Sequence, residues 1–303
     1  MTVRARFAPS PTGDLHLGGA WTALASWTVA RRAYGANVLR IEDIDRPRVV
    51  RGSQARIEED LRWLGLSWDE GPILQSERDA VYDDALSRLA SRGLVYPCDC
   101  SRAEIASVAS APHAGEHIIY PGLCRDRHPL RRMKRSPALR ARIADETLAY
   151  EDVAVGRVVQ NLARDIGDFV LRRGDGVFAY HFAVVVDDVA MGITDVVRGA
   201  DLVASTPIQI WLARALGAHP PRYTHVPMVV TEGSARLEKR THGATVREVR
   251  QSGVSAERVV GVLAHGLGLA PTDAPASAAE IARASEPRPI RWRRDAWPIP
   301  TSW

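Results

Sequence analysis

A histidine and two glycines near the N-terminus have the spacing of a nucleotide site. His16, Gly18 and Gly19 follow a turn-rich stretch, Pro-Ser-Pro-Thr-Gly, at residues 9–13. A nucleotide can lie against backbone that lacks Cβ atoms, and the free N–H groups at the start of a helix favour phosphate. A lone histidine is more often a satisfied loop residue, so the interpretation depends on the residues around it.

The flanking residues predict the elements that would position this segment. The alternating run from Val3 to Phe7 predicts a strand, and the apolar spacing from Leu17 to Trp27 predicts a helix that extends to Tyr34. A second apolar run at residues 37–41 follows at once. The pattern is typical of a βαβ unit whose active edge lies where the first strand meets the helix.

Three cysteines form a second candidate site. Cys98, Cys100 and Cys124 are too few and too clustered for a disulfide framework, which favours reduced thiols that can bind a metal. Hydrophobic periodicity fails between residues 94 and 139, which predicts a small inserted module held together by something other than a core. The thiols could also be small buried hydrophobic side chains.

Composition limits the class of protein. The chain has 303 residues, of which 46% are hydrophobic and 25% charged, as in soluble globular proteins. It has no apolar run long enough to span a bilayer and no leader-like start, so we expect a cytoplasmic protein with no membrane partner. A net charge of +4 is compatible with RNA binding. The basic run at residues 131–135 is either a solvated loop or a phosphate contact.

The remaining pattern alternates helices with strands. Helices are predicted at residues 53–64, 79–91, 206–216, 246–251 and 256–268, and strands at residues 153–162, 168–172 and 225–231. The β-branched apolar run at residues 182–186 predicts a buried parallel strand of the catalytic sheet. We expect the tail from Thr272, rich in proline and alanine, to be marginally ordered.

Two blocks of sequence resemble a known family. The runs RFAPSPTGDLHLGGA at residues 6–20 and LRIEDID at residues 39–45 resemble the signatures of class I glutamyl-tRNA synthetases, with His16 to Gly19 at the "HIGH" position. The chain most resembles the truncated paralogue family, glutamyl-queuosine tRNA(Asp) synthetase, which keeps the catalytic half and lacks the anticodon-binding half. Gly19 is a mild departure from the fourth "HIGH" residue.

The resemblance implies an α/β fold, a Rossmann-like class I aminoacyl-tRNA synthetase catalytic domain with an inserted zinc-binding module. We expect the first half of the catalytic domain at residues 1–95 and the zinc-binding, acceptor-type module at residues 96–140. The rest of the insertion and the second half would occupy residues 141–245. Residues 246–303 would form a short helical segment, too short for an anticodon-binding domain.

The resemblance also implies the substrate sites. His16 and Lys239 would be catalytic, and the residues expected to bind ATP are His16, Gly18, Gly19, Arg236 and Lys239. Those expected to bind L-glutamate are Arg6, Ala8, Ser10, Glu42, Tyr180 and Arg198. Glu42 would take the amine and Arg198 would grip a carboxylate bidentately. Taken without the family blocks, Arg198 could instead pair with Asp187 or Asp188, and Tyr180 could be a half-buried strand tyrosine.

The second nucleotide motif departs from the family. Arg236-Leu237-Glu238-Lys239-Arg240 stands where the family has Lys-Leu-Ser-Lys. An acid beside a triphosphate is unfavourable unless Glu238 pairs with Arg236 or Arg240, so the affinity for ATP stays open.

The cysteines resemble the zinc site of the paralogue family. There Cys98, Cys100, Cys124 and Tyr120 would bind one structural Zn²⁺, with His117 as a competitor for the fourth position. A metal-free cluster is the other possibility.

The implied activity is activation of L-glutamate with ATP, as its Mg²⁺ complex, to glutamyl-AMP without tRNA. Glutamate would then pass to the queuosine base in the anticodon loop of tRNA(Asp). We expect a monomer. Two alternatives stay open: a stand-alone glutamyl-tRNA synthetase fragment, and a catalytically inactive RNA-binding paralogue, which Glu238 keeps in consideration.

Overall fold

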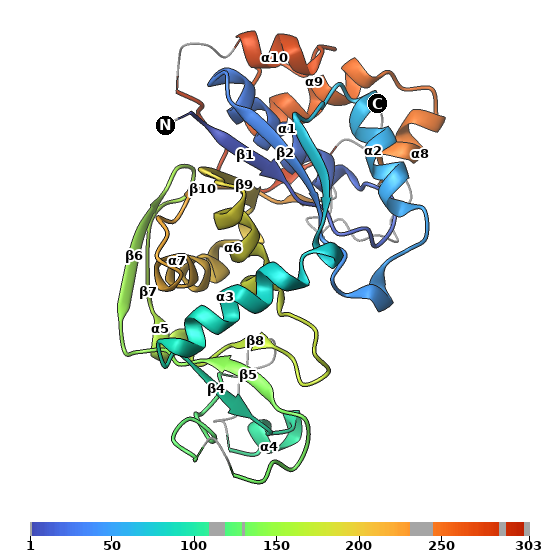
Figure 1. Ribbon diagram of the computed structural model, residues 1–303. Helices are drawn as coiled ribbons and strands as arrows, with labels where there is room; N and C mark the ends of the chain where they lie inside the picture. Colours follow the sequence, from blue (N-terminus) through green and yellow to red (C-terminus); the bar gives the residue numbers. More distant parts are fainter. Residues whose placement is uncertain (1, 109–118, 129–130, 231–244, 285–288, 300–303) are drawn as a thin grey trace.

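A parallel sheet lies at the centre of the molecule (Figure 1). The computed structural model describes residues 2–108, 119–128, 131–230, 245–284 and 289–299. The sheet has five strands in the order β10-β9-β1-β2-β3, and every neighbouring pair is parallel. Its strands are β1 (Arg4–Phe7), β2 (Ala36–Ile41), β3 (Glu70–Leu74), β9 (Asp195–Gly199) and β10 (Arg222–Val226).

The predicted opening βαβ unit is confirmed. α1 (Leu17–Arg32) connects β1 to β2, and its buried residues include Trp21 and Leu24. Those side chains belong to a core shared with three C-terminal helices, of which the last two lie beside α1 in Figure 1. These are α8 (Val246–Gln251), α9 (Ala256–Leu267) and α10 (Ala278–Ala284).

One prediction about the sheet was wrong. Residues 182–186 lie in α6 (Tyr180–Ala190), and β9 is the strand that occupies the sheet beside β1. The run is apolar because α6 is surrounded: residues 182–188 are all buried. A helix buried on every side and a buried parallel strand give the same short apolar pattern, so periodicity could not separate them. The strand predicted at residues 225–231 is also divided, because β10 ends at Val226 and β11 (Val229–Val230) pairs with β12 (Trp297–Pro298) in a second sheet.

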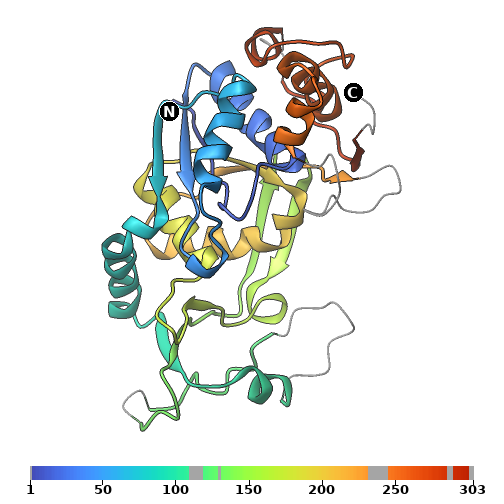
Figure 2. The same ribbon diagram turned by 90° about the vertical axis from the view of Figure 1, so that its right-hand side faces the viewer.

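The strands between residues 95 and 172, here called the insertion, extend from the parallel sheet on one side, as Figure 2 shows. An antiparallel sheet joins β4 (Val95–Cys98), β5 (Ala138–Ala141) and β8 (Val170–Arg172). A long hairpin, β6 (Thr147–Asp152) and β7 (Gly156–Asn161), runs back from it to β10. Two short helices, α4 (Arg102–Ala106) and α5 (Leu162–Asp165), complete this part.

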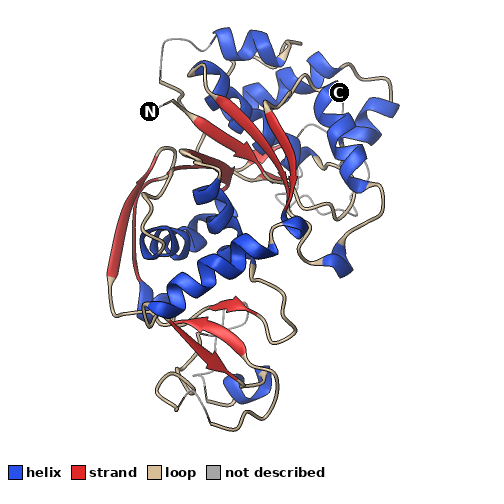
Figure 3. Cartoon of the chain, viewed as in Figure 1, coloured by secondary structure: helices blue, strands red, loops and turns tan. Residues whose placement is uncertain are grey.

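Helices fill the space between insertion and sheet (Figure 3). They are α3 (Asp79–Ser91), α6 and α7 (Thr206–Ala215). Elsewhere, α2 (Ser53–Trp63) lies near α8. Short 3₁₀ turns in the described residues are η1 (Arg46–Arg48), η2 (Gln75–Glu77) and η3 (Ala200–Ser205). The helices predicted at residues 53–64, 79–91, 206–216, 246–251 and 256–268 are thus confirmed within one or two residues.

The described part of the tail is better ordered than expected. α10 and β12 follow Thr272, and Ile281 and Trp292 are buried in the core that contains α1 and α9. Burial of these side chains fixes a segment whose composition alone favours disorder. Among the helices described, none has the length and apolar character needed to cross a bilayer.

Candidate active site

His16 is the N-cap residue of α1. Its backbone is extended, and its Nδ1 accepts a hydrogen bond from the Gly19 N–H at 3.0 Å. A Cβ atom at Gly18 would lie 3.1 Å from this Nδ1, and one at Gly19 would lie 2.7 Å from a methyl carbon of Leu15. A side chain at Gly18 or Gly19 would therefore push against His16 or Leu15, which would have to shift.

The start of α8 holds this turn from the other side. The Val246 N–H donates to the Leu15 carbonyl at 2.8 Å, and Thr245 forms a bridge with His16. Arg236 and Lys239, which the family resemblance assigns to ATP, lie outside the described residues, as does Glu238. Thr245, the first described residue after them, lies beside His16.

The residues predicted for glutamate come together at one edge of the sheet. Arg6 lies on β1, Glu42 directly follows β2, and Arg198 lies on β9, so all three are near the carboxyl ends of parallel strands. That edge is where open α/β sheets bind ligands. The loop after β1 is tied to it, because the Glu42 N–H donates to the Pro9 carbonyl at 3.0 Å. In the same loop Ala8 is half-buried and Ser10 is exposed.

A buried chain of alternating charges supports two of these residues. Asp188 Oδ1 lies 2.6 Å from Arg40 Nη1 and 3.5 Å from Arg6 Nε, and Arg40 Nη2 lies 3.2 Å from Glu42 Oε1. Burial raises the pKa of Glu42, and the charges of Arg40 and Arg6 oppose that rise. Asp188 thus positions both arginines.

The pairing considered for Arg198 in the absence of the family blocks is not observed. Asp188 pairs with Arg6 and Arg40, and Asp187 accepts hydrogen bonds from Gln75, Arg78 and Tyr82 at 2.6–2.8 Å. Sequence reasoning missed Arg40 and Asp188 as site residues. Their signal was a charged residue inside an otherwise apolar buried run.

Arg198 is instead held by polar neutral groups. Its Nε donates to His225 Nε2 at 3.0 Å, its Nη1 to Gln209 Oε1 at 2.6 Å, and its Nη2 to Thr206 Oγ1 at 2.7 Å and the Leu202 carbonyl at 3.4 Å. An arginine has five N–H donors. Contacts among described residues thus leave one N–H on Nη1, so the expected bidentate grip requires one of these bonds to be released.

Tyr180 lies at the first turn of α6, so the strand position considered for it was wrong. It is 42% exposed, yet the surrounding protein and the negative charge of Glu42 raise its pKa to about 12. Arg198 and Arg6 are also close enough to act on it electrostatically. At neutral pH the hydroxyl is therefore a neutral donor near Glu42, Arg198 and Arg6.

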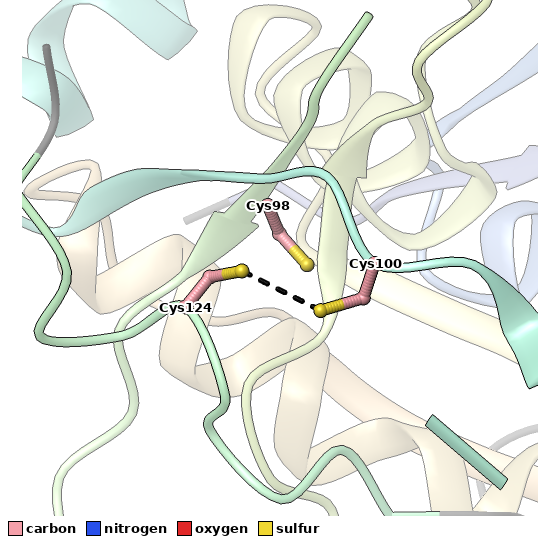
Figure 4. A group of neighbouring side chains, drawn as sticks. All are labelled: Cys98, Cys100 and Cys124. Atoms are coloured by element: carbon pink, nitrogen blue, oxygen red, sulfur yellow. Dashed lines mark hydrogen bonds between the residues drawn. The ribbon is translucent and has the colours of Figure 1, made fainter. Parts of the chain in front are cut away.

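The three thiols form a cluster in the insertion (Figure 4). The Sγ atoms of Cys98, Cys100 and Cys124 all lie within 4.8 Å of one another, with Cys100 and Cys124 3.4 Å apart. The Tyr120 hydroxyl lies 3.3 Å from the first sulfur and 3.7 Å from the second. Tetrahedral Zn–S bonds of about 2.3 Å separate sulfurs by roughly 3.8 Å, so the donor set fits a zinc ion. His117 lies outside the described residues.

Residues of the basic run at 131–135 form ion pairs inside the module. Arg131 lies 3.3 Å from Cys124 Sγ and pairs with Asp99, and Lys134 pairs with Glu104 at 2.6 Å. For these two residues of the basic run at 131–135, the structure therefore gives a role inside the module.

The family of tRNA synthetases class I (E and Q), catalytic domain, matches residues 2–286. The chain belongs to this family. It is accordingly a ligase, and the α/β fold is that of a class I catalytic domain.

Two relatives that share one name, and one solved structure, align with most of the chain. A protein named Glutamyl-Q tRNA(Asp) synthetase from Symbiobacterium thermophilum is 47% identical over 292 residues, which are 91% of this chain and 90% of the relative. One of the same name from Deinococcus radiodurans is 47% identical over 274 residues, 88% of this chain and 90% of the relative. A glutamate tRNA ligase from Elizabethkingia meningosepticum, solved in complex with its amino acid, superposes with a TM-score of 0.85 at 28% identity. That superposition covers 99% of this chain and 67% of the other.

Proposed function

We propose that this enzyme activates L-glutamate with ATP to glutamyl-AMP in the absence of tRNA, and then transfers glutamate to the queuosine base in the anticodon loop of tRNA(Asp). The observation that best supports this proposal is that four residues lie near one another at the carboxyl edge of the sheet: Arg6, Glu42, Tyr180 and Arg198. One substrate with an ammonium group and two carboxylates calls for both signs of charge. The names of the relatives supply the acceptor.

The charged residues have complementary roles in this proposal. Glu42 binds the ammonium group, while Arg198 and Arg6 bind carboxylates and the Tyr180 hydroxyl donates a hydrogen bond. Ala8 and Ser10 line the pocket from the loop after β1. Held in this way, the α-carboxylate is aligned for attack on the α-phosphate of ATP, and alignment is the main contribution of such a site.

ATP, with Mg²⁺, lies against the His16 turn. Gly18 and Gly19 allow the backbone to approach it, and the start of α1 offers N–H groups to phosphate. His16, Arg236 and Lys239 stabilise the charge that develops on the phosphate oxygens as pyrophosphate leaves.

A structural Zn²⁺ holds the inserted module in this proposal. Cys98, Cys100, Cys124 and Tyr120 are its ligands, and the spacing of the three sulfurs supports them. Zinc would replace the core that this module lacks, since its buried apolar cluster consists of little more than the ligands themselves. The enzyme acts as a monomer in the cytoplasm.

Two assays test the function. ATP–pyrophosphate exchange that depends on glutamate, run without tRNA, is expected to occur; its absence would favour an inactive RNA-binding paralogue. Labelled glutamate should then be transferred to tRNA(Asp) that carries queuosine and not to tRNA(Asp) that lacks it. Transfer to the 3′ end of a glutamate-accepting tRNA instead would identify a stand-alone glutamyl-tRNA synthetase.

A further inference from the structure

A buried histidine and aspartate lie behind Arg198. His225 on β10 is 1% exposed, Asp152 at the end of β6 is 4% exposed, and His225 Nδ1 lies 2.6 Å from Asp152 Oδ2. The other carboxylate oxygen, Oδ1, accepts the backbone N–H groups of Ala154, Val155 and His225 at 2.9–3.2 Å. The aspartate is therefore fixed by three backbone donors, with one oxygen directed to the imidazole.

The contacts of the imidazole determine which nitrogen carries its proton. Arg198 Nε can only donate, and it lies 3.0 Å from His225 Nε2, so Nε2 must be the acceptor. Nδ1 then carries the hydrogen and donates it to Asp152. Burial lowers the pKa of His225, in keeping with a neutral ring. Only one tautomer satisfies Asp152 and Arg198 together.

We propose that Asp152 and His225 are positioning residues for glutamate recognition: Asp152 selects the His225 tautomer that accepts from Arg198 Nε, which turns the remaining N–H of Nη1 toward the substrate carboxylate. This inference rests on the proposed role of Arg198. It gives the β6–β7 hairpin of the insertion a direct part in the affinity for glutamate, because Asp152 is the last residue of β6.

Asp152→Asn changes the tautomer while keeping the shape. The three backbone donors at Oδ1 retain the amide oxygen there, so the amide NH₂ faces His225 Nδ1. Nδ1 must then accept, the proton moves to Nε2, and an N–H faces the Arg198 N–H. In pyrophosphate exchange we expect the KM for glutamate to rise about tenfold or more, with the KM for ATP nearly unchanged.

His225→Gln should make the hydrogen bond to Arg198 independent of Asp152. A glutamine oxygen near the position of Nε2 can accept from Arg198 without any help from Asp152. In the His225→Gln background, Asp152→Asn should therefore add little to the KM for glutamate. ¹⁵N NMR of the histidine ring should report a protonated Nδ1 in the unmodified protein and a protonated Nε2 in Asp152→Asn.

The matched control is Asp195→Asn. Asp195 is a buried aspartate on β9, the strand that carries Arg198, and it accepts a hydrogen bond from Arg222 Nε at 2.7 Å. It lies at the amino end of β9, opposite to the end near Arg198. The substitution Asp195→Asn should lower thermal stability without changing the KM for glutamate. An Asp152→Asn protein that behaves like this control, or that loses glutamate affinity equally in both backgrounds, overturns the inference. No exchange by the unmodified protein overturns the proposed function itself.

Discussion

At the scale of single residues, one carboxylate holds two guanidinium groups. Asp188 lies between Arg6 and the fully buried Arg40, and Arg40 in turn contacts Glu42. A buried charge that loses its partner is far more costly than a surface pair, because water cannot replace the partner. The same carboxylate therefore affects both stability and the glutamate pocket.

Asp188→Asn should lower the free energy of unfolding by about 3 kcal/mol, because it leaves Arg40 incompletely compensated. Urea unfolding at neutral pH measures this change. Asp83→Asn is the control: Asp83 forms an exposed pair with Arg172 at 3.4 Å, and its removal should change stability by less than about 1 kcal/mol. Equal effects of the two substitutions would contradict the assigned burial of the network.

Arg198→Lys keeps the positive charge but removes the planar fork that His225, Gln209 and Thr206 hold. The KM for glutamate should rise by about 10- to 100-fold, since a hydrogen bond to a charged group is lost. Pyrophosphate exchange as a function of glutamate concentration measures the effect. An unchanged glutamate dependence would remove Arg198 from the pocket.

At the scale of elements, α2 and α8 meet at an aspartate whose surroundings do not suit its charge. Asp60 is fully buried, its carboxylate oxygens have no hydrogen-bond partner among the described residues, and Arg247 Nη2 lies 3.4 Å away. Burial raises the pKa of Asp60 to about 6, although Arg247 opposes the rise. The contact between these helices should therefore depend on pH.

Asp60→Asn tests that dependence. An unfolded aspartate titrates near pH 4, so between about pH 4 and 6 the folded state binds more protons and stability falls as the pH rises. Above pH 6 the substitution should stabilise the protein by roughly 1–3 kcal/mol, and below pH 4 it should have little effect. Thermal unfolding at pH 4.5 and pH 8 measures both values. If Asp60→Asn instead lowered stability at pH 8, the charged carboxylate of Asp60 would be stabilising the folded protein.

The close contact between α9 and α1 depends on a glycine, Gly266. A Cβ atom at Gly266 would lie 2.6 Å from the rings of Trp21 and Trp297. Alanine normally stabilises a helix by about 1 kcal/mol relative to glycine, but overpacking costs about 1–3 kcal/mol. Gly266→Ala should therefore be destabilising in urea unfolding, whereas Glu257→Ala on the exposed side of α9 should change stability little.

At the scale of the whole molecule, the thiol cluster and the glutamate pocket are independent. Cys98, Cys124 and Tyr120 form a small buried cluster of their own, separate from the two larger cores that surround the sheet and helices. Damage confined to the thiol cluster should therefore leave glutamate activation largely intact, because the β6–β7 hairpin that contacts β10 is not part of that cluster. Transfer to RNA, which needs a larger surface, is where the loss should be observed.

Metal analysis should find one zinc per chain in protein purified without chelator. Removal of zinc should reduce transfer to tRNA(Asp) much more than pyrophosphate exchange, and Cys124→Ser should have the same effect. Tyr120→Phe tests the fourth ligand: retained zinc in this variant, together with loss of zinc in His117→Ala, would assign that position to His117. Protein without zinc that still transfers glutamate normally would contradict the structural role.

The sequence by itself determined the opening βαβ unit, most helices and the family. Turn residues, helix ends and motif blocks are local, and the family resemblance along the chain was enough to predict that Arg6, Glu42, Tyr180 and Arg198 bind glutamate. The fourth ligand of the thiol cluster, the roles of Arg236 and Lys239, and the division of the chain at residues 95, 140 and 245 stay predictions.

Tertiary structure decided what surrounds each residue. Residues 182–186 became a helix because a fully surrounded helix has no polar face to mark its period. Arg40 and Asp188 are 148 positions apart, and Asp152 and His225 are 73 apart, so no local pattern couples them. These partnerships exist because folding removes water from the charges, after which each buried polar group needs a partner wherever the chain brings one.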